Sequence, residues 1–160
     1  MVSLATVGGK ITANIYNQMA NFITSPGFFK GTITTATSVP GGTYWGLSTG
    51  PVFTTITDPL NGFSTATGLY TCKSAGEYLV GAQFKTNNTG VATAASFYKN
   101  GTALTTSGNS AGTGFTGGTL LFPVRLALGD TIGLKIGNTF TTQSDAPAEN
   151  NYMFLQQVSL

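Results

Sequence analysis

The sequence contains no histidine and a single cysteine, Cys72. Without histidine, the serine–histidine and cysteine–histidine catalytic arrangements are excluded, and so is the commonest protein metal ligand. With one cysteine, no disulfide can form within the chain, and cysteine-rich zinc clusters are excluded too. We therefore expect a fold that is held together by packing, and we expect no enzymatic activity.

Charged residues are also scarce, at 8% of the 160 residues, with a formal net charge of +2. The seven Lys and Arg residues are spread along the chain with no two adjacent. Neutralising nucleic-acid phosphates requires clustered cations, so nucleic acid is not an expected partner. No stretch approaches the length of a membrane span, and the first residues lack the pattern of a secretory signal. We expect synthesis in a cytoplasm and no membrane span.

The five carboxylates are the remaining candidates for chemistry. Asp145 and Glu149 lie close together in a predicted loop, and their oxygen atoms are the hard donors that calcium prefers. Their spacing matches no recognised calcium loop, and nothing places two acids on adjacent strands as a glycosidase pair. No cofactor is expected, and calcium at this loop is the alternative.

Apolar material is plentiful, at 41% of the residues, including eleven Phe and six Tyr. This is enough to bury the core of one domain. One segment predicts a helix: Thr12 can cap it, and apolar residues recur at helical spacing from Ile15 to Ile23. The helix should end before Pro26 and Gly27. Its apolar stripe has to dock either on its own domain or on its copies in an oligomer.

From Phe28 onward the hydrophobic period changes to two, which predicts strands. Alternation is clear over residues 78–85, 120–128, 132–137 and 152–159. Pro123 predicts an edge strand or a bulge in the second of these. We expect residues 1–27 to form an N-terminal anchor segment and residues 28–160 to form an all-β sandwich or jelly roll.

Turn signals separate these strands. Asn61-Gly62 and Asn100-Gly101 predict hairpin turns, because both residue types tolerate positive φ. Residues 105–118 are almost all Thr, Ser, Gly and Asn around Phe115, and they predict a long exposed loop.

Four motifs, the first of which consists of two segments, resemble the jelly-roll domains of the complement globular head and tumour necrosis factor-like family. Residues 68–71 (Gly-Leu-Tyr-Thr) and 75–80 (Ala-Gly-Glu-Tyr-Leu-Val) are similar to its central paired strands. Residues 97–101 (Phe-Tyr-Lys-Asn-Gly) are similar to its hairpin, 126–132 (Leu-Ala-Leu-Gly-Asp-Thr-Ile) to its turn and following strand, and 151–155 (Asn-Tyr-Met-Phe-Leu) to its terminal strand. The resemblance spans about the last hundred residues, and it implies a ten-stranded jelly roll.

The same resemblance implies a homotrimer with aromatic and aliphatic residues at the subunit contacts. The candidate interface residues are Tyr78, Tyr98, Tyr152 and Phe154. Each of them could equally belong to the core of its own chain, which is the commoner place for a strand aromatic.

Residues 7–17 (Val-Gly-Gly-Lys-Ile-Thr-Ala-Asn-Ile-Tyr-Asn) resemble the opening segment of many bacteriophage tail and fibre proteins. This resemblance implies a virion protein whose N-terminal segment either attaches to other virion proteins or bundles with its copies at the threefold axis.

Two functions compete on this basis. In the first, a tail-fibre, baseplate or capsid-surface trimer presents the loops 105–118 and 139–151 to a host-surface glycan or protein. Tyr44, Trp45 and Phe115 are then the candidate recognition residues, with core packing as the alternative, above all for Trp45. In the second, the trimer is a capsid decoration protein that stabilises the head without binding a receptor. A cellular ligand of the tumour necrosis factor type is a third reading, for which the sequence offers neither a membrane anchor nor a secretion signal.

Overall fold

The computed structural model describes residues 27–35, 38–50, 52–86, 93–109, 116–137, 139–141 and 151–159. The predicted helix of the N-terminal segment lies outside the described residues. The strands are β1 (Phe28–Thr32), β2 (Ser38–Val39), β3 (Thr55–Thr57), β4 (Phe63–Ser64), β5 (Leu69–Thr71), β6 (Gly76–Thr86), β7 (Thr93–Lys99), β8 (Thr102–Asn109), β9 (Thr116–Leu126), β10 (Thr131–Ile136), β11 (Phe140–Thr141) and β12 (Tyr152–Ser159).

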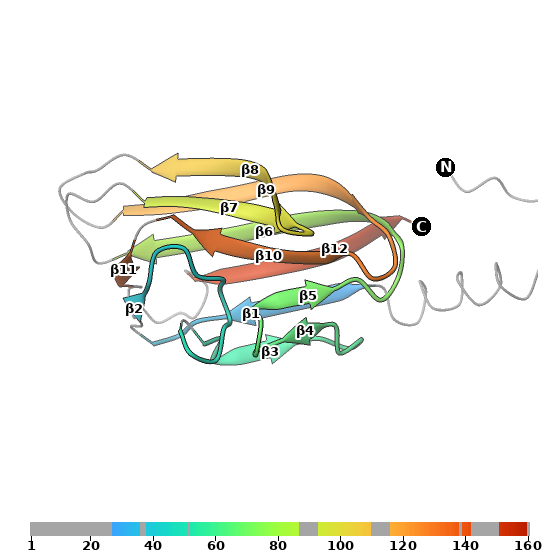
Figure 1. Cartoon of the computed structure of the whole chain (residues 1–160), viewed down its shortest axis with the longest axis horizontal. Coiled ribbons are helices and arrows are strands. Elements are labelled where there is room, and N and C mark those ends of the chain that lie inside the picture. Colours follow the sequence, from blue (N-terminus) through green and yellow to red (C-terminus); the bar gives the residue numbers. More distant parts are fainter. Residues whose placement is uncertain are drawn as a thin grey trace, which may run out of the picture.

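These strands form two five-stranded sheets that lie face to face (Figure 1). The first sheet has the order β3-β1-β12-β6-β9, and the second has the order β4-β5-β10-β7-β8. The short strands β11 and β2 pair separately, and all the described strand pairs are antiparallel. The predicted all-β sandwich is confirmed.

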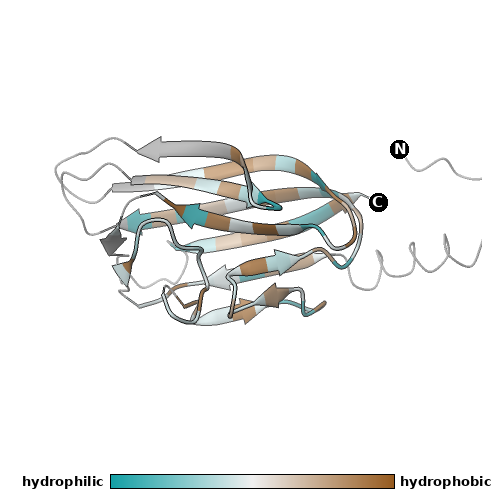
Figure 2. Ribbon diagram, in the orientation of Figure 1, coloured by the Kyte–Doolittle hydropathy of each residue, from teal (hydrophilic) through white to brown (hydrophobic). Residues whose placement is uncertain are grey.

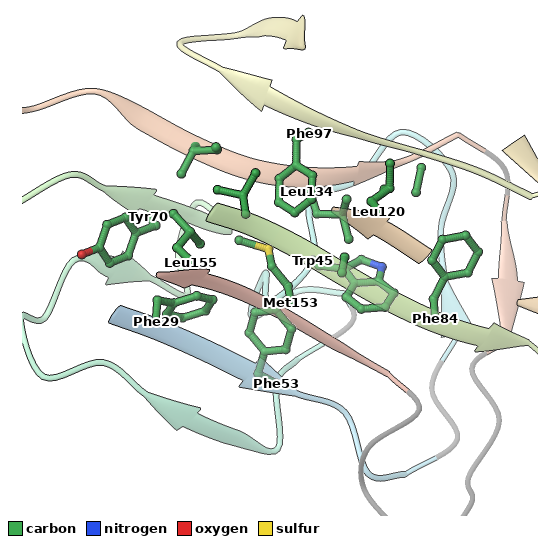
Figure 3. Packing of buried hydrophobic residues seen from close by; sticks show 14 of the residues in the cluster. Phe29, Trp45, Phe53, Tyr70, Phe84, Phe97, Leu120, Leu134, Met153 and Leu155 are labelled. Atoms are coloured by element: carbon green, nitrogen blue, oxygen red, sulfur yellow. The ribbon is translucent and has the colours of Figure 1, made fainter. Parts of the chain in front are cut away.

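The core lies between the two sheets, where the alternating apolar residues face one another (Figure 3). On β6, Tyr78, Val80, Ala82 and Phe84 are all buried, as the period of two predicts. Hydrophobic and hydrophilic residues alternate along the long strands (Figure 2). Full burial of a large apolar side chain contributes about 1.5–3 kcal/mol, so this interior stabilises the sandwich without a disulfide.

Two buried polar side chains, one near each end of β12, are hydrogen-bonded to neighbouring segments. The Gln157 side chain accepts a hydrogen bond from the Gly27 backbone N–H (3.0 Å) and donates one to the Ala75 carbonyl (3.0 Å). At the other end of β12, the Asn151 side-chain oxygen accepts a hydrogen bond from the Lys85 backbone N–H (2.8 Å). The two residues pin β12 to its neighbours at both ends.

One of the two predicted hairpin turns is confirmed. Asn100 (φ 49°) and Gly101 (φ 81°) connect the paired strands β7 and β8. Asn61 also has a positive φ (51°), but β3 and β4 on either side of it belong to different sheets. The prediction of a hairpin at Asn61 was therefore wrong: this turn carries the chain from one sheet to the other.

The prediction of a loop over residues 105–118 was also wrong for much of this segment. β8 continues to Asn109 and β9 begins at Thr116, because backbone pairing with β7 and β6 needs no apolar side chains. Residues 110–115, including Phe115, lie outside the described residues. Leu128 does not continue the buried face of β9, since that strand ends at Leu126 and Leu128 is 72% exposed.

Candidate functional site

The outward face of the first sheet carries apolar side chains on neighbouring strands. One row across β9, β6, β12 and β1 consists of Leu121, Gly81, Phe154 and Lys30. The next row consists of Pro123, Leu79, Gln156 and Phe28. We call the apolar members of this surface, together with Tyr152 and Val158 on β12, the apolar face.

Glycine shapes the centre of the apolar face. Gly81 lies between Phe154 and Leu121 in the ladder, and a Cβ atom at this position would collide with the Phe154 ring and come within 3.1 Å of Leu121 Cδ1. The absence of a side chain therefore lets the Phe154 ring lie across β6 toward Leu121. Leu121 remains 59% exposed and Val158 53% exposed. A monomer would leave this apolar surface in water.

The charges near the apolar face stand at its margins. At one end, Arg125 lies opposite Glu77, with 3.7 Å between the guanidinium and the carboxylate. On β1, the Lys30 ammonium lies 5.4 Å from the centre of the Tyr152 ring. The middle of the surface is uncharged, which is the composition found at the centres of subunit interfaces.

The four candidate interface residues divide among three places. Tyr152 and Phe154 lie together on the apolar face, with ring centroids 6.2 Å apart. Tyr78 points the other way, into the core, where it is fully buried and its hydroxyl donates a hydrogen bond to the Ser74 carbonyl (2.6 Å). The prediction of Tyr78 as an interface residue was therefore wrong, and the core alternative holds. Successive residues of a strand point to opposite faces, so Leu79 and not Tyr78 lies on the outward face of β6. Tyr98 lies on the outward face of the second sheet.

The apolar face also contains side chains that were not among the sequence candidates: Phe28, Leu79, Leu121, Pro123 and Val158. The signal was present in β9, where apolar residues occupy consecutive positions from Leu120 to Val124. A strand with apolar residues on both faces needs cover on both sides. In β9, Leu120 is buried in the sandwich while Leu121 is exposed.

The candidate recognition residues are also separated. Trp45 is fully buried, with its ring packed edge-on against Phe53 and Phe84 at 6.4 Å, so its prediction as a recognition residue was wrong and the core alternative holds (Figure 3). Tyr44 is half-buried and packs edge-on against Tyr98, with ring centroids 6.1 Å apart. Phe115 lies outside the described residues.

Lys135 lies beside the Tyr44 and Tyr98 rings. Its ammonium lies 5.0 Å from the centre of the Tyr44 ring and 4.9 Å from that of Tyr98. Both distances lie within the range of cation–π attraction. The tyrosine–lysine cluster, as we call Tyr44, Tyr98 and Lys135, lies on the sheet opposite to the apolar face.

Asp130 has a structural role at the turn before β10. Its carboxylate accepts hydrogen bonds from the Asn100 side-chain amide (2.8 Å) and the Ala127 backbone N–H (2.8 Å), and it pairs with the Lys99 ammonium (2.9 Å). The hydrogen bond from Asn100 is the largest of the effects that lower the pKa of Asp130, from 3.8 to about 2. Residues 127–130 form the turn before β10 that the resemblance implied, and the contact with Asn100 ties this turn to the β7–β8 hairpin.

The described residues contain no group of three or more metal-ligating His, Cys, Asp or Glu side chains. Asp145 and Glu149, the calcium candidates, lie outside the described residues.

Cys72 is buried, and burial is the main cause that raises the pKa of its thiol. This is the environment of a small core residue rather than of a reactive thiol. No described helix is long and apolar enough to span a membrane.

Solved structures with a similar fold include two tumour necrosis factor-like proteins. Murine APRIL at pH 5.0 superposes with a TM-score of 0.61 at 12% identity, over 84% of this chain and all of that chain. The Eiger TNF from S. frugiperda superposes with a TM-score of 0.64, also at 12% identity, over 83% of this chain and 91% of that chain.

The fold is a tumour necrosis factor-like jelly roll. No protein-family model matches the sequence, and no curated protein sequence matches it. At 12% identity, the likeness establishes the fold alone.

Proposed function

We propose that this chain is a non-enzymatic structural protein that assembles as a homotrimer through the apolar face. The observation that carries the proposal is the exposure of Leu121 and Val158 beside the half-buried Phe154, in a surface whose charges stand at the margins. A threefold assembly would bury these side chains and leave the second sheet in solvent. The trimer that the family resemblance implies supports the same arrangement.

Light scattering on the purified full chain tests the assembly. The expected mass at micromolar concentration is three times 16.5 kDa. Burial of a leucine side chain contributes about 1.5–3 kcal/mol, so Leu121→Arg should weaken each subunit contact at least about tenfold. Leu128→Arg is the matched control, because Leu128 is also exposed but lies on a turn outside the apolar face. A monomeric wild type, or equal dissociation of the two variants, would refute this interface.

We further propose that the trimer belongs to a bacteriophage virion and presents its outward surfaces to the host cell at a tail fibre, baseplate or capsid surface. The support is the segment 7–17, which resembles the opening of phage tail and fibre proteins. In this arrangement the N-terminal segment binds another virion protein. Antibodies raised against the full chain should label intact particles, and particles without the label would refute a virion location.

Host attachment and capsid decoration predict different results in an adsorption assay. If the trimer attaches to the host, an excess of purified protein should block adsorption of particles to cells. If it is a decoration protein, adsorption should be unaffected, and particles that lack the chain should instead lose heat resistance.

A further inference from the structure

The tyrosine–lysine cluster brings together residues from three distant parts of the chain. Tyr98 lies on β7 and Lys135 on β10, and Tyr44 reaches them because its backbone forms a bridge with Lys135. The adjacent Trp45 backbone N–H donates a hydrogen bond to the Leu134 carbonyl (2.9 Å). The segment that carries Tyr44 is thus fixed along β10, and its ring is held against the sheet by backbone pairing.

Two glycines make room for the Tyr44 ring. Gly133 pairs with Tyr98 in the ladder, and a Cβ atom there would lie 2.7 Å from Leu69 Cδ2 and 3.0 Å from Tyr44 Cδ1. Gly68 has a φ of 69°, and a Cβ atom there would lie 2.7 Å from Tyr44 Cβ. Side chains at either position would displace Tyr44, so the placement of the two rings around Lys135 depends on both glycines.

The positive charge of Lys135 has no carboxylate partner among the described residues. The three described carboxylates are engaged elsewhere: Asp58 accepts a hydrogen bond from the Phe63 backbone N–H, Glu77 faces Arg125, and Asp130 pairs with Lys99. The two ring faces attract the ammonium, but they do not neutralise it. An anionic group brought by a ligand would complete the site.

The two tyrosine side chains indicate which groups the ligand carries besides the anionic group. Each hydroxyl can donate and accept hydrogen bonds. A tyrosine hydroxyl is ordinarily protonated at neutral pH, and burial raises the pKa of Tyr44 further. The rings also offer apolar surface, which suits the C–H groups of a sugar and which an inorganic anion would leave unused.

We propose that Tyr44, Tyr98 and Lys135 form a binding site for a carboxylate-bearing saccharide. The Lys135 ammonium would pair with the carboxylate, and the two phenols would contact the hydroxyl and C–H groups of the sugar ring. This inference deepens the attachment function proposed above. The cluster lies on the sheet opposite to the apolar face, so three copies would remain open in the trimer, and weak single sites would combine on a polysaccharide surface.

The test is a chemical-shift titration of the isotope-labelled full chain with tri-galacturonic acid. Its methyl ester, which has the same sugar rings without the charge, and inorganic phosphate are the comparison ligands. Lys135→Met keeps most of the side-chain length and removes the charge, and Tyr98→Phe removes one hydroxyl. Lys73→Met is the matched control, because Lys73 is an exposed lysine outside the cluster.

The expected result is binding of tri-galacturonic acid in the millimolar range, with affinity lowered at least about tenfold by Lys135→Met. Tyr98→Phe should weaken binding, Lys73→Met should not change it, and the methyl ester should bind at least about tenfold more weakly. The proposal is overturned if the acid does not bind, if the ester or phosphate binds as tightly as the acid, or if Lys135→Met binds like wild type. Repeating the titration with the Leu121→Arg variant separates this outcome from a failure of trimer assembly, because binding per chain does not require the trimer.

Discussion

The carboxylate of Asp130 offers the sharpest test of how the turn before β10 is stabilised. It receives three charge-assisted contacts of 2.8–2.9 Å from Asn100, Ala127 and Lys99. A hydrogen bond to a charged group contributes about 1.5–3 kcal/mol when it is shielded from water. These contacts lie near the surface, where solvent competes, so Asp130→Ala should lower the free energy of unfolding by about 1–2 kcal/mol in total at pH 7.

The pH dependence of this effect has a defined sign. The pKa of Asp130 is lowered from 3.8 to about 2 in the folded chain, so its contribution is fully present above about pH 4. As the pH falls toward 2, the folded carboxylate becomes protonated and the difference between wild type and Asp130→Ala should shrink. Urea denaturation at a fixed protein concentration measures both values, since oligomers unfold in a concentration-dependent way.

The matched control is Glu77→Gln, which disrupts an exposed ion pair with 3.7 Å between its charged groups. That change should lower stability by less than about 0.5 kcal/mol at any pH. A destabilisation by Asp130→Ala that is as large at pH 2 as at pH 7 would refute the argument, and so would a variant as stable as wild type at pH 7.

Two further predictions concern the interior. Trp45→Ala should lower the free energy of unfolding by about 3–5 kcal/mol, because its fully buried ring fills the space between Phe53 and Phe84, and a loss below about 1 kcal/mol in a thermal or urea melt would contradict this packing. The buried Cys72 thiol, whose pKa is raised by burial, should react with a colorimetric disulfide reagent at least about tenfold more slowly in the native chain than in urea, and equal rates would show that the thiol is accessible.

Much of the fold could be predicted from the sequence, because buried strands carry a period of two. Residues 78–84 and 132–136 alternate in the sequence, and the structure buries the apolar positions. Turns could be recognised where the backbone requires a particular residue, as at Gly101 with its φ of 81°. At Asn61, the same local signal said nothing about which sheet the next strand would join, because sheet membership depends on pairing partners distant in sequence.

The candidate site was less accessible to sequence reasoning. Tyr78, Tyr152 and Phe154 are all strand aromatics, and alternation alone does not say which face meets the partner sheet. The cluster at Lys135 is harder still, since Tyr44 and Tyr98 become neighbours only through their common position beside β10. Its lysine was visible in the sequence merely as one of seven scattered cations.

The pairing of β1 with β12 also determines how the domain would carry mechanical load. Gly27 and Gln157 exchange backbone and side-chain hydrogen bonds, so both ends of the described chain leave from the same end of the sandwich (Figure 1). A force that pulls these two ends apart would open the β1–β12 ladder one hydrogen bond at a time, like a zipper. A force between Gly27 and the opposite end of the sandwich would instead shear many hydrogen bonds together, because they run perpendicular to the strands. A load applied between the start of β1 and the opposite end of the sandwich would therefore act along the stronger axis of the domain.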